Sequence, residues 1–185
     1  SGAELFGSAT ALANGEKAPD GYVALVIGAS YATKKLPLES LKQLVKLISY
    51  PIVLIGGPEE KADGDVLAAL DPSRILNTCG KYSLHESAAM VRDARLVISH
   101  DTGMLYIACA FEKNVIAIWG ATSPALQVEP FMPEGTKARV FQSIVPNLSC
   151  QPCSNFGTKT CPKGHFNCMK QQDLPQIAKQ VGEMW

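Results

Sequence analysis

Two short stretches of this sequence carry residue types that bind phosphate. In the first, residues 28–37, a small-residue turn supplies the hydroxyls of Ser30 and Thr33 and the adjacent cations Lys34 and Lys35. A cationic loop in front of a helix start attracts an anion, most naturally a phosphate. The glycine spacing is neither that of a P-loop nor that of a GxGxxG fingerprint. A solvated loop with surface lysines explains the same residues, and this stretch alone leaves both interpretations open.

The second stretch is Ser99-His-Asp-Thr-Gly103, which lies between an apolar run and an apolar helical segment. Asp101 and Thr102 are expected to cap the following helix, while Gly103 leaves its N–H groups open to a ligand. Capping explains an Asp or a Thr here, but not the whole Asp-Thr-Gly string. His100 has the chemistry of a general base, although we favour a buried, supporting role for it.

Two further turns carry weaker signals. Gly56 and Gly57 permit close approach of a ligand or a tight chain reversal. Glu59 follows them and can reach ribose or sugar hydroxyls, although an acidic residue at a helix start is also explained by the helix dipole. Tyr82 follows Gly80 and can stack on a base, because aromatic faces bind planar rings. A tyrosine packed on the domain surface is the alternative.

All four turns follow short apolar runs that alternate with helical patterns. Such runs predict buried strands, and the amphipathic segments between them predict helices. The alternation predicts an α/β fold, a Rossmann-like parallel sheet with helices on both faces. Ligands bind such sheets beyond the carboxyl ends of the strands, where these turns lie. The predicted strands are 22–27, 52–55, 74–78, 95–99, 115–119 and 139–144, and the predicted helices are 38–48, 59–70, 83–92, 103–111 and 173–183.

Composition narrows the function further. The 185 residues, 46% of them hydrophobic, suffice for one domain with a real core. Seventeen basic and 17 acidic residues cancel, and without a basic run a nucleic-acid partner is not expected. The longest apolar run, Met104–Phe111, is too short to cross a bilayer, and the first residues do not resemble a signal peptide. We expect residues 1–20 to be a linker or leader and residues 21–185 to form one ligand-binding domain.

Six cysteines fall into two groups. Cys79 and Cys109 lie among apolar or small residues and are expected to be buried thiols. The spacing of the other four suits either a metal knuckle or a disulfide pair, and the redox compartment decides between them. These four residues are Cys150, Cys153, Cys161 and Cys168.

Taken in order, these stretches resemble the carboxyl-terminal half of glycosyltransferase family 9, the lipopolysaccharide heptosyltransferases. The resemblance implies the GT-B architecture, in which two Rossmann-like domains face each other across a cleft. The amino-terminal domain of that family binds the acceptor and supplies the catalytic base, and the carboxyl-terminal domain binds the nucleotide-sugar donor, typically an ADP-heptose. The similarity runs from about residue 22 to the C-terminus, through segments 28–37, 54–57, 79–84, 98–104, 114–120 and 150–169.

The resemblance implies a role for each candidate residue. Lys34 matches the lysine that neutralises the donor diphosphate, with Ser30 or Thr33 nearby. The string Asp101–Gly103 matches the one that contacts diphosphate and sugar at a helix N-terminus. The expected donor-binding residues are Ser30, Thr33, Lys34, Glu59, Tyr82, Asp101, Thr102, Gly103 and Tyr106.

Two of these assignments need comment. Tyr82 stands where the family lines its adenine pocket, and Glu59 or Glu60 stands where an acidic residue can reach the ribose. Tyr106 departs from the family, which usually has a histidine facing the phosphates at this position. A phenol can still donate a hydrogen bond there. Lys35 stands for the usual arginine, a milder change.

The implied function is inverting transfer of a sugar, expected to be heptose from an ADP-heptose, onto a lipid-linked saccharide of the lipopolysaccharide type. The acceptor hydroxyl attacks the anomeric carbon while a base from the other domain takes its proton. Lys34 and the helix near Gly103 stabilise the departing diphosphate, so no divalent metal or other cofactor is required. No catalytic residue is expected in this chain, which should not turn over alone. The family works in the bacterial cytoplasm, and contact with the inner membrane is expected through the other domain.

Three questions stay open. The four clustered cysteines can hold a structural zinc, remain free thiols or form disulfides after purification. The donor can be a UDP-sugar, used by another GT-B transferase or a related epimerase. The chain can also be a non-catalytic Rossmann-like binding module with a zinc-stabilised tail.

Overall fold

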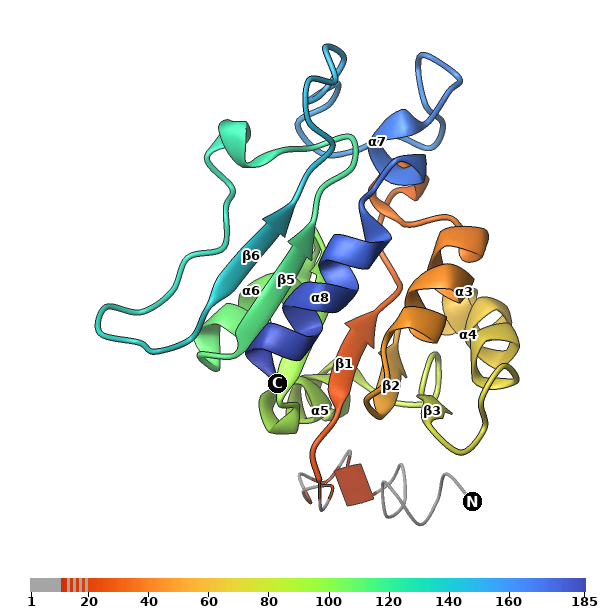
Figure 1. The fold of residues 1–185 in the computed structure, drawn as a ribbon, viewed down its shortest axis with the longest axis vertical. Helices are drawn as coiled ribbons and strands as arrows, with labels where there is room; N and C mark the ends of the chain where they lie inside the picture. Colours follow the sequence, from red (N-terminus) through yellow and green to blue (C-terminus); the bar gives the residue numbers. More distant parts are fainter. Residues whose placement is uncertain (1–10, 13, 15, 17, 19) are drawn as a thin grey trace.

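The computed structural model (Figure 1) describes residues 11, 12, 14, 16, 18 and 20–185 of the chain. Its six strands form one parallel sheet, as every pair of neighbouring strands has parallel register. All six predicted strands are found, with ends that differ by at most one residue. The strands are β1 (Val23–Val26), β2 (Ile52–Ile55), β3 (Ile75–Asn77), β4 (Leu96–His100), β5 (Asn114–Ile118) and β6 (Val140–Ser143).

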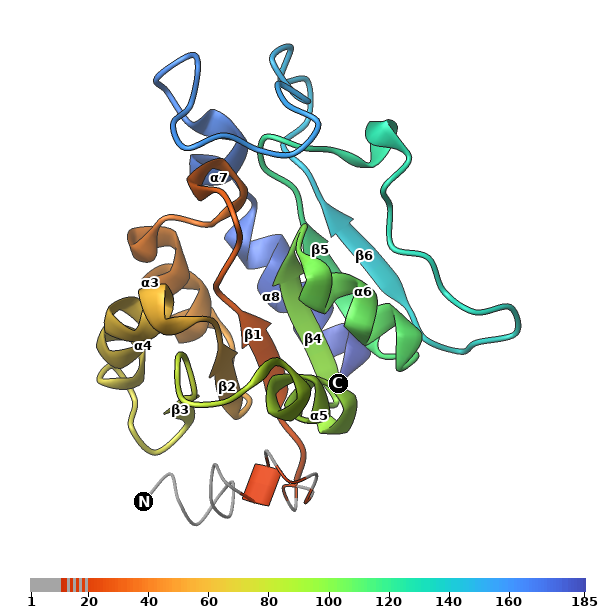
Figure 2. The same ribbon diagram turned by 180° about the vertical axis from the view of Figure 1, so that it is seen from behind.

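Helices cover both faces of the sheet, which confirms the predicted α/β class (Figures 1 and 2). The helices α3 (Leu38–Leu47) and α8 (Leu174–Met184) pack on one face, with α4 (Lys61–Ala68) beside α3. The helices α5 (Leu84–Asp93) and α6 (Gly103–Ala110) pack on the other face. None of the helices in the described part of the chain is long and apolar enough to span a membrane.

Short helical turns account for the differences from prediction. The helix predicted from residue 59 begins later, because Pro58 opens a 3-10 turn and the Glu60 carboxylate accepts the Gly57 N–H at 2.9 Å. Three other short turns were not predicted, because elements of three or four residues carry no readable periodicity. The short elements are η1 (Ala32–Lys34), η2 (Pro58–Glu60), η3 (Pro124–Leu126) and α7 (Asn167–Lys170).

The sheet divides the core into two layers because successive strand residues point to opposite faces. Leu54 of β2 belongs to the layer under α3 and α8, and its neighbour Val53 belongs to the layer under α5 and α6. Both are fully buried, as expected for strands covered on two sides.

The predicted linker, residues 1–20, lies mostly outside the described residues. Of those described, Leu12 is fully buried in the layer under α5 and α6, and Ala18 is also buried there. The boundary at residue 20 stays a prediction.

The strand order is β3-β2-β1-β4-β5-β6, the order typical of dinucleotide-binding sheets. The chain moves outward from β1 to β3, then crosses back to place β4 on the other side of β1. The turns after β1 and β4 therefore lead away from each other and leave a crevice between them at the carboxyl edge. Ligands bind at such switch points.

Leu54→Ala should test the tight packing of the first core layer. The substitution removes a fully buried side chain from β2, and the expected loss of unfolding free energy is about 3 kcal/mol. Leu47→Ala, at a 47% exposed position of α3, is the control and should change stability by less than about 0.5 kcal/mol. Urea unfolding followed by circular dichroism measures the unfolding free energy of both variants. Equal losses of unfolding free energy would contradict the tight packing of Leu54 in the core.

Candidate functional site

A pocket of about 550 Å³ opens at the carboxyl edge of the sheet. This volume is typical of small-molecule sites. The turns after β1, β2, β3 and β4 all line it, which are the four turns that the sequence singled out. The predicted site residues among its lining are Ser30, Glu59, Tyr82, Thr102 and Gly103.

The pocket has an apolar part and a polar part. Tyr82 and Leu84 line the apolar part together with Ile107 of α6, and Leu84 is 63% exposed. Such aromatic and aliphatic surface suits a planar ring. Hydroxyls and backbone groups of Ser30 and Thr102 supply polar contacts from the turns after β1 and β4.

Glycines let the turns around the pocket approach one another. A Cβ on Gly28 would lie 3.0 Å from the Oε2 atom of Glu60, so a larger residue in the β1 turn would press on this carboxylate of the β2 turn. Gly80 has a φ of +69°, and a Cβ there would lie 2.8 Å from the Cα atom of Pro58. The pocket wall therefore depends on missing side chains at these two turns.

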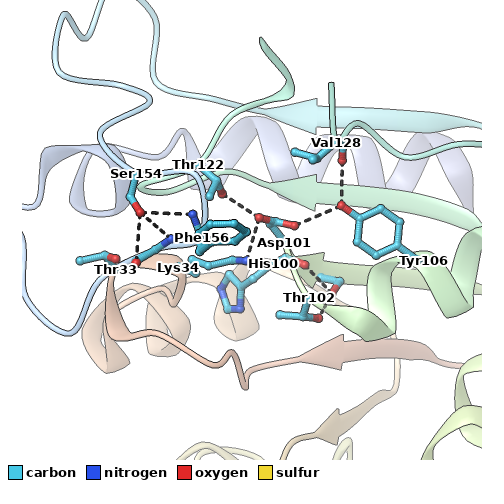
Figure 3. Close-up of polar contacts among 12 residues, drawn as sticks. Thr33, Lys34, His100, Asp101, Thr102, Tyr106, Thr122, Val128, Ser154 and Phe156 are labelled. Atoms are coloured by element: carbon cyan, nitrogen blue, oxygen red, sulfur yellow. Dashed lines mark hydrogen bonds and ion pairs between the residues drawn. The ribbon is translucent and has the colours of Figure 1, made fainter. Parts of the chain in front are cut away.

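An ion pair joins the turns after β1 and β4 beside this pocket (Figure 3). The Nζ atom of Lys34 lies 2.8 Å from the Oδ2 atom of Asp101, and both side chains are largely buried. The Thr122 hydroxyl, from the loop after β5, donates to the same oxygen at 2.8 Å. The sequence analysis assigns Lys34 and Asp101 to one binding site, and in the structure the two side chains are in contact. Neither lines the pocket itself, but Asp101 directly precedes Thr102, which does.

Tyr106 holds the other oxygen of Asp101. Its hydroxyl lies 3.2 Å from Asp101 Oδ1 and 2.8 Å from the carbonyl oxygen of Val128 (Figure 3). Burial and the charge of Asp101 raise the pKa of Tyr106 to about 12, so the phenol stays a neutral donor. At the position where the resemblance predicts a phosphate-facing group, this side chain therefore binds the aspartate and the loop after η3.

The prediction that Asp101 and Thr102 cap α6 is wrong. Thr102 is the N-cap residue but makes no side-chain cap hydrogen bond, and the Asp101 carboxylate binds Lys34, Thr122 and Tyr106 instead. The Asp101 carboxylate is engaged by these partners, and the Thr102 hydroxyl lies 3.4 Å from the Ser99 hydroxyl instead. The Thr102 side chain caps none of the first N–H groups of α6, and Gly103 brings this helix end to the pocket wall. An anion placed there would be stabilised by the helix dipole.

His100 supports the site from within the core. It is 1% exposed, and its Nε2 atom accepts the Leu36 N–H at 3.0 Å. Burial lowers the pKa of His100 to about 4, and the positive charges of Lys35 and Lys34 act in the same direction. The ring is therefore neutral at physiological pH and holds the segment after Lys35 in place.

Glu60 is the acidic residue that the turn after β2 fixes most firmly. Its carboxylate accepts from Lys35 at 2.9 Å and from the Gly57 N–H at 2.9 Å, and it lines the pocket. Glu59 also lines the pocket but is exposed. The sequence left both glutamates open for a ribose contact, and both are at the pocket.

Two features of the site differ from the sequence-based picture. The Thr33 hydroxyl does not line the pocket, because it is hydrogen-bonded to the backbone of Thr158. Thr122 was missed, although its loop directly follows Trp119-Gly120 at the end of a predicted strand. A search of every strand end, rather than of four, would have included it.

The cysteines are all free thiols. Cys79 and Cys109 are buried as expected, and burial raises the pKa of Cys79 to about 12. Among the four clustered cysteines, Cys150 lies 3.8 Å from the Nε2 atom of His165. Within the described residues, no three His, Cys, Asp or Glu side chains are arranged to hold a metal ion. The thiols as placed therefore do not fit a zinc site.

The sequence matches the family model described as glycosyltransferase family 9 (heptosyltransferase) over residues 4–165. Lipopolysaccharide heptosyltransferase 2 of Salmonella typhimurium is 27% identical over 110 residues, which cover 57% of this chain and 30% of that protein.

Two solved structures share the fold. The E. coli ADP-heptose lps heptosyltransferase II superposes with a TM-score of 0.63 at 17% identity, covering 96% of this chain and 51% of that one. The E. coli heptosyltransferase WaaC with ADP gives a TM-score of 0.65 at 20% identity, covering 89% and 44%. This chain therefore spans about half the length, or less, of the relatives it matches.

His100 should make stability depend on pH below neutrality. Its folded-state pKa of about 4 lies below the ordinary value of 6.5, so the unfolded chain binds a proton that the folded protein does not. The His100 contribution is fully present above pH 6.5 and is lost as the pH falls toward 4, with a slope approaching ~1.4 kcal/mol per pH unit. His100→Gln retains an acceptor for the Leu36 N–H but does not titrate.

Urea unfolding at pH 7 and pH 5 tests this expectation. The unfolding free energy of His100→Gln should fall less between the two pH values than that of the unmodified protein. His85→Gln, at an exposed histidine of α5, is the control and should keep the original pH dependence. The same pH dependence in all three proteins would show that His100 is not responsible.

Proposed function

The chain belongs to glycosyltransferase family 9, and from this premise we propose that it binds the nucleotide-sugar donor of an inverting glycosyltransferase. The donor is proposed to be an ADP-heptose and the acceptor a lipid-linked saccharide of the lipopolysaccharide type. The observation that carries the proposal is the Lys34–Asp101 ion pair, which borders a pocket with an apolar wall and an uncapped helix N-terminus.

The pocket chemistry orders the parts of such a donor. The adenine ring is assigned to the apolar part beside Tyr82 and Leu84, and the ribose to the glutamates of the turn after β2. The diphosphate is assigned to the space between Lys34 and the N-terminus of α6, because both groups favour negative charge. This order leaves the sugar nearest to Asp101.

We propose that donor binding changes the partner of the Lys34 ammonium. Without a donor, Lys34 is neutralised by Asp101. A diphosphate brings additional negative charge, so we propose that the Lys34 ammonium moves toward it. Asp101 remains held by Thr122 and Tyr106 and gains a free acceptor position for a sugar hydroxyl. Lys34 and Asp101 then contact different parts of the same ligand.

The transfer step follows from this arrangement. The acceptor hydroxyl attacks the anomeric carbon, its proton goes to a base of the acceptor-binding half, and the diphosphate leaves from the opposite face of the sugar. Negative charge on the leaving diphosphate grows in the transition state. Lys34 and the N–H groups of α6 stabilise it there, which lowers the barrier. Closure of the two halves would exclude water from the reacting centre. The chain alone is not expected to turn over.

We place this reaction in a reducing compartment, the bacterial cytoplasm. The six free thiols support this assignment, because cysteines in oxidising compartments usually pair. Contact with the inner membrane is proposed for the acceptor-binding half.

ADP should bind this chain in a saturable manner, and Lys34→Ala should weaken the binding about tenfold or more. The substitution removes the cation and leaves the Asp101 carboxylate unpaired near the diphosphate. Lys42→Ala is the control, because Lys42 pairs with Glu39 on the surface of α3 and should leave ADP affinity unchanged. Isothermal titration calorimetry measures all three proteins.

The competing functions give different results in the same titration. Tighter binding of UDP than of ADP would favour a UDP-sugar transferase or an epimerase domain. Indifference to ADP, UDP and GDP at millimolar concentration would contradict donor binding and favour a non-catalytic binding module.

A further inference from the structure

The cysteine-rich loop, residues 150–168, is hydrogen-bonded to the segment that carries Lys34. Thr33 Oγ1 accepts the Thr158 N–H at 2.7 Å and donates to the Thr158 carbonyl at 2.9 Å. The Thr33 N–H donates to the same carbonyl at 3.2 Å. Thr33 is 3% exposed, and its hydroxyl is hydrogen-bonded to the loop rather than open to a ligand. Three hydrogen bonds therefore fix η1 to a residue 125 positions away in sequence.

Two glycines allow the chain to close around Lys34. Gly157 has a φ of +95°, and a Cβ there would lie 2.8 Å from the Cδ atom of Lys34 and 2.9 Å from the Cβ atom of Tyr31. The backbone of the loop therefore lies directly on the Lys34 stem. On another side, a Cβ on Gly120 would clash with the carbonyl oxygen of Thr33 and lie 3.3 Å from the Cα atom of Lys34. A Cβ on Gly157 would therefore displace the Lys34 stem or Tyr31, and a Cβ on Gly120 would displace the Thr33 carbonyl next to Lys34.

Hydrogen bonds also fix the conformation of residues 151–157 in the cysteine-rich loop. The Ser154 hydroxyl accepts the Gly157 N–H at 2.9 Å and donates to the Gly157 carbonyl at 3.1 Å, which closes the turn from 154 to 157 (Figure 3). The Cys153 N–H donates to the carbonyl of Ala121 at 2.9 Å, and the Gln151 side chain donates to the carbonyl of Gly120 at 2.6 Å. The same loop after β5 supplies Thr122 to Asp101. The cysteine-rich loop, the loop after β5 and η1 thus form one connected unit.

We propose that Gly157 and Thr158 are positioning residues that fix the stem of Lys34, so that its ammonium can reach both Asp101 and the proposed diphosphate site. They act through the lysine and do not contact the donor. A lysine has a long stem with four rotatable bonds, and a stem fixed by packing loses less entropy when its ammonium binds a phosphate. The consequence for the donor rests on the function proposed above, whereas the orientation of Lys34 does not.

The role of Thr33 changes with this proposal. The resemblance implies a hydroxyl near the donor phosphates, but both hydrogen-bonding capacities of that hydroxyl are engaged by Thr158. Ser30, which is exposed and lines the pocket, remains the hydroxyl available to a ligand in this turn.

Gly157→Ala tests the proposal directly, and Gly164→Ala is its matched control. Both glycines belong to the cysteine-rich loop and have positive φ, but a Cβ on Gly164 has no neighbour within 4 Å. The first readout is the rate at which acetic anhydride acylates Lys34 without ligand, measured by peptide mass spectrometry. We expect Gly157→Ala to raise this rate about fivefold and Gly164→Ala to leave it unchanged. Equal rates in both variants would overturn the proposal.

The second readout is ADP affinity, in a double-mutant cycle with Lys34→Ala. Gly157→Ala should raise the dissociation constant for ADP about fivefold, and should have no further effect once Lys34 is absent. An effect that persists without Lys34 would show that Gly157 acts on the fold or on the donor itself. If the unmodified protein does not bind ADP, the proposed function fails, while the acylation rates still decide the role of Gly157.

A second pair of variants covers the case in which Gly157→Ala does not fold. Thr33→Val removes the hydroxyl that binds Thr158, and Thr33→Ser keeps it. Thr33→Val should accelerate acylation of Lys34, and Thr33→Ser should restore the original rate. Loss of ADP affinity in Thr33→Val with an unchanged acylation rate would instead identify Thr33 as a direct phosphate ligand and contradict the proposal.

Discussion

The ion pair between Lys34 and Asp101 is the interaction on which the rest of the site depends. It forms between the turns after β1 and β4, which are neighbours only because the chain crosses back after β3. Two largely buried charges are costly to remove from water, and the loss is offset only when further hydrogen bonds complete the pair. Thr122 and Tyr106 supply those bonds to the two carboxylate oxygens. The strand order thus brings Lys34 and Asp101 together, and their ion pair holds the two turns on either side of the crevice.

Two adjacent lysines divide this task. Lys34 binds Asp101 of the β4 turn, while Lys35 binds Glu60 of the β2 turn at 2.9 Å. The β1 turn is therefore tied to both of its neighbours in the sheet by opposite-charge pairs. If a diphosphate draws Lys34 away, the Lys35 pair and the His100 contact to Leu36 still hold the turn. Under the proposed function, these two contacts keep the β1 turn in place while Lys34 exchanges Asp101 for the donor.

The sequence predicted the sheet and the four turns because their signals are local. Strands buried on both faces are continuous apolar runs, and the helix predicted over residues 83–92 opens with a local capping box of Ser83 and Glu86. The capping expectation for Asp101 failed because the competing partner, Lys34, is distant in sequence. Thr122 and Thr158 were not identified for the same reason, since each contributes through a contact that no spacing rule encodes. Motifs of neighbouring residues thus predicted where the pocket lies. Which side chains face it depends on hydrogen bonds between residues that are distant in sequence.

Tyr106 places a neutral phenol at the position where the resemblance implies a histidine. An imidazole can carry a positive charge at neutral pH, whereas the pKa of about 12 keeps this phenol neutral. The single proton of this hydroxyl faces two acceptors, Asp101 Oδ1 and the Val128 carbonyl, so it is engaged within the protein. Under the proposed function, and with no cation at this position, we expect the Lys34 ammonium and the N-terminus of α6 to stabilise the bound diphosphate. The accuracy with which Lys34 is held then matters more, and the glycine contacts and threonine hydrogen bonds around its stem provide that accuracy.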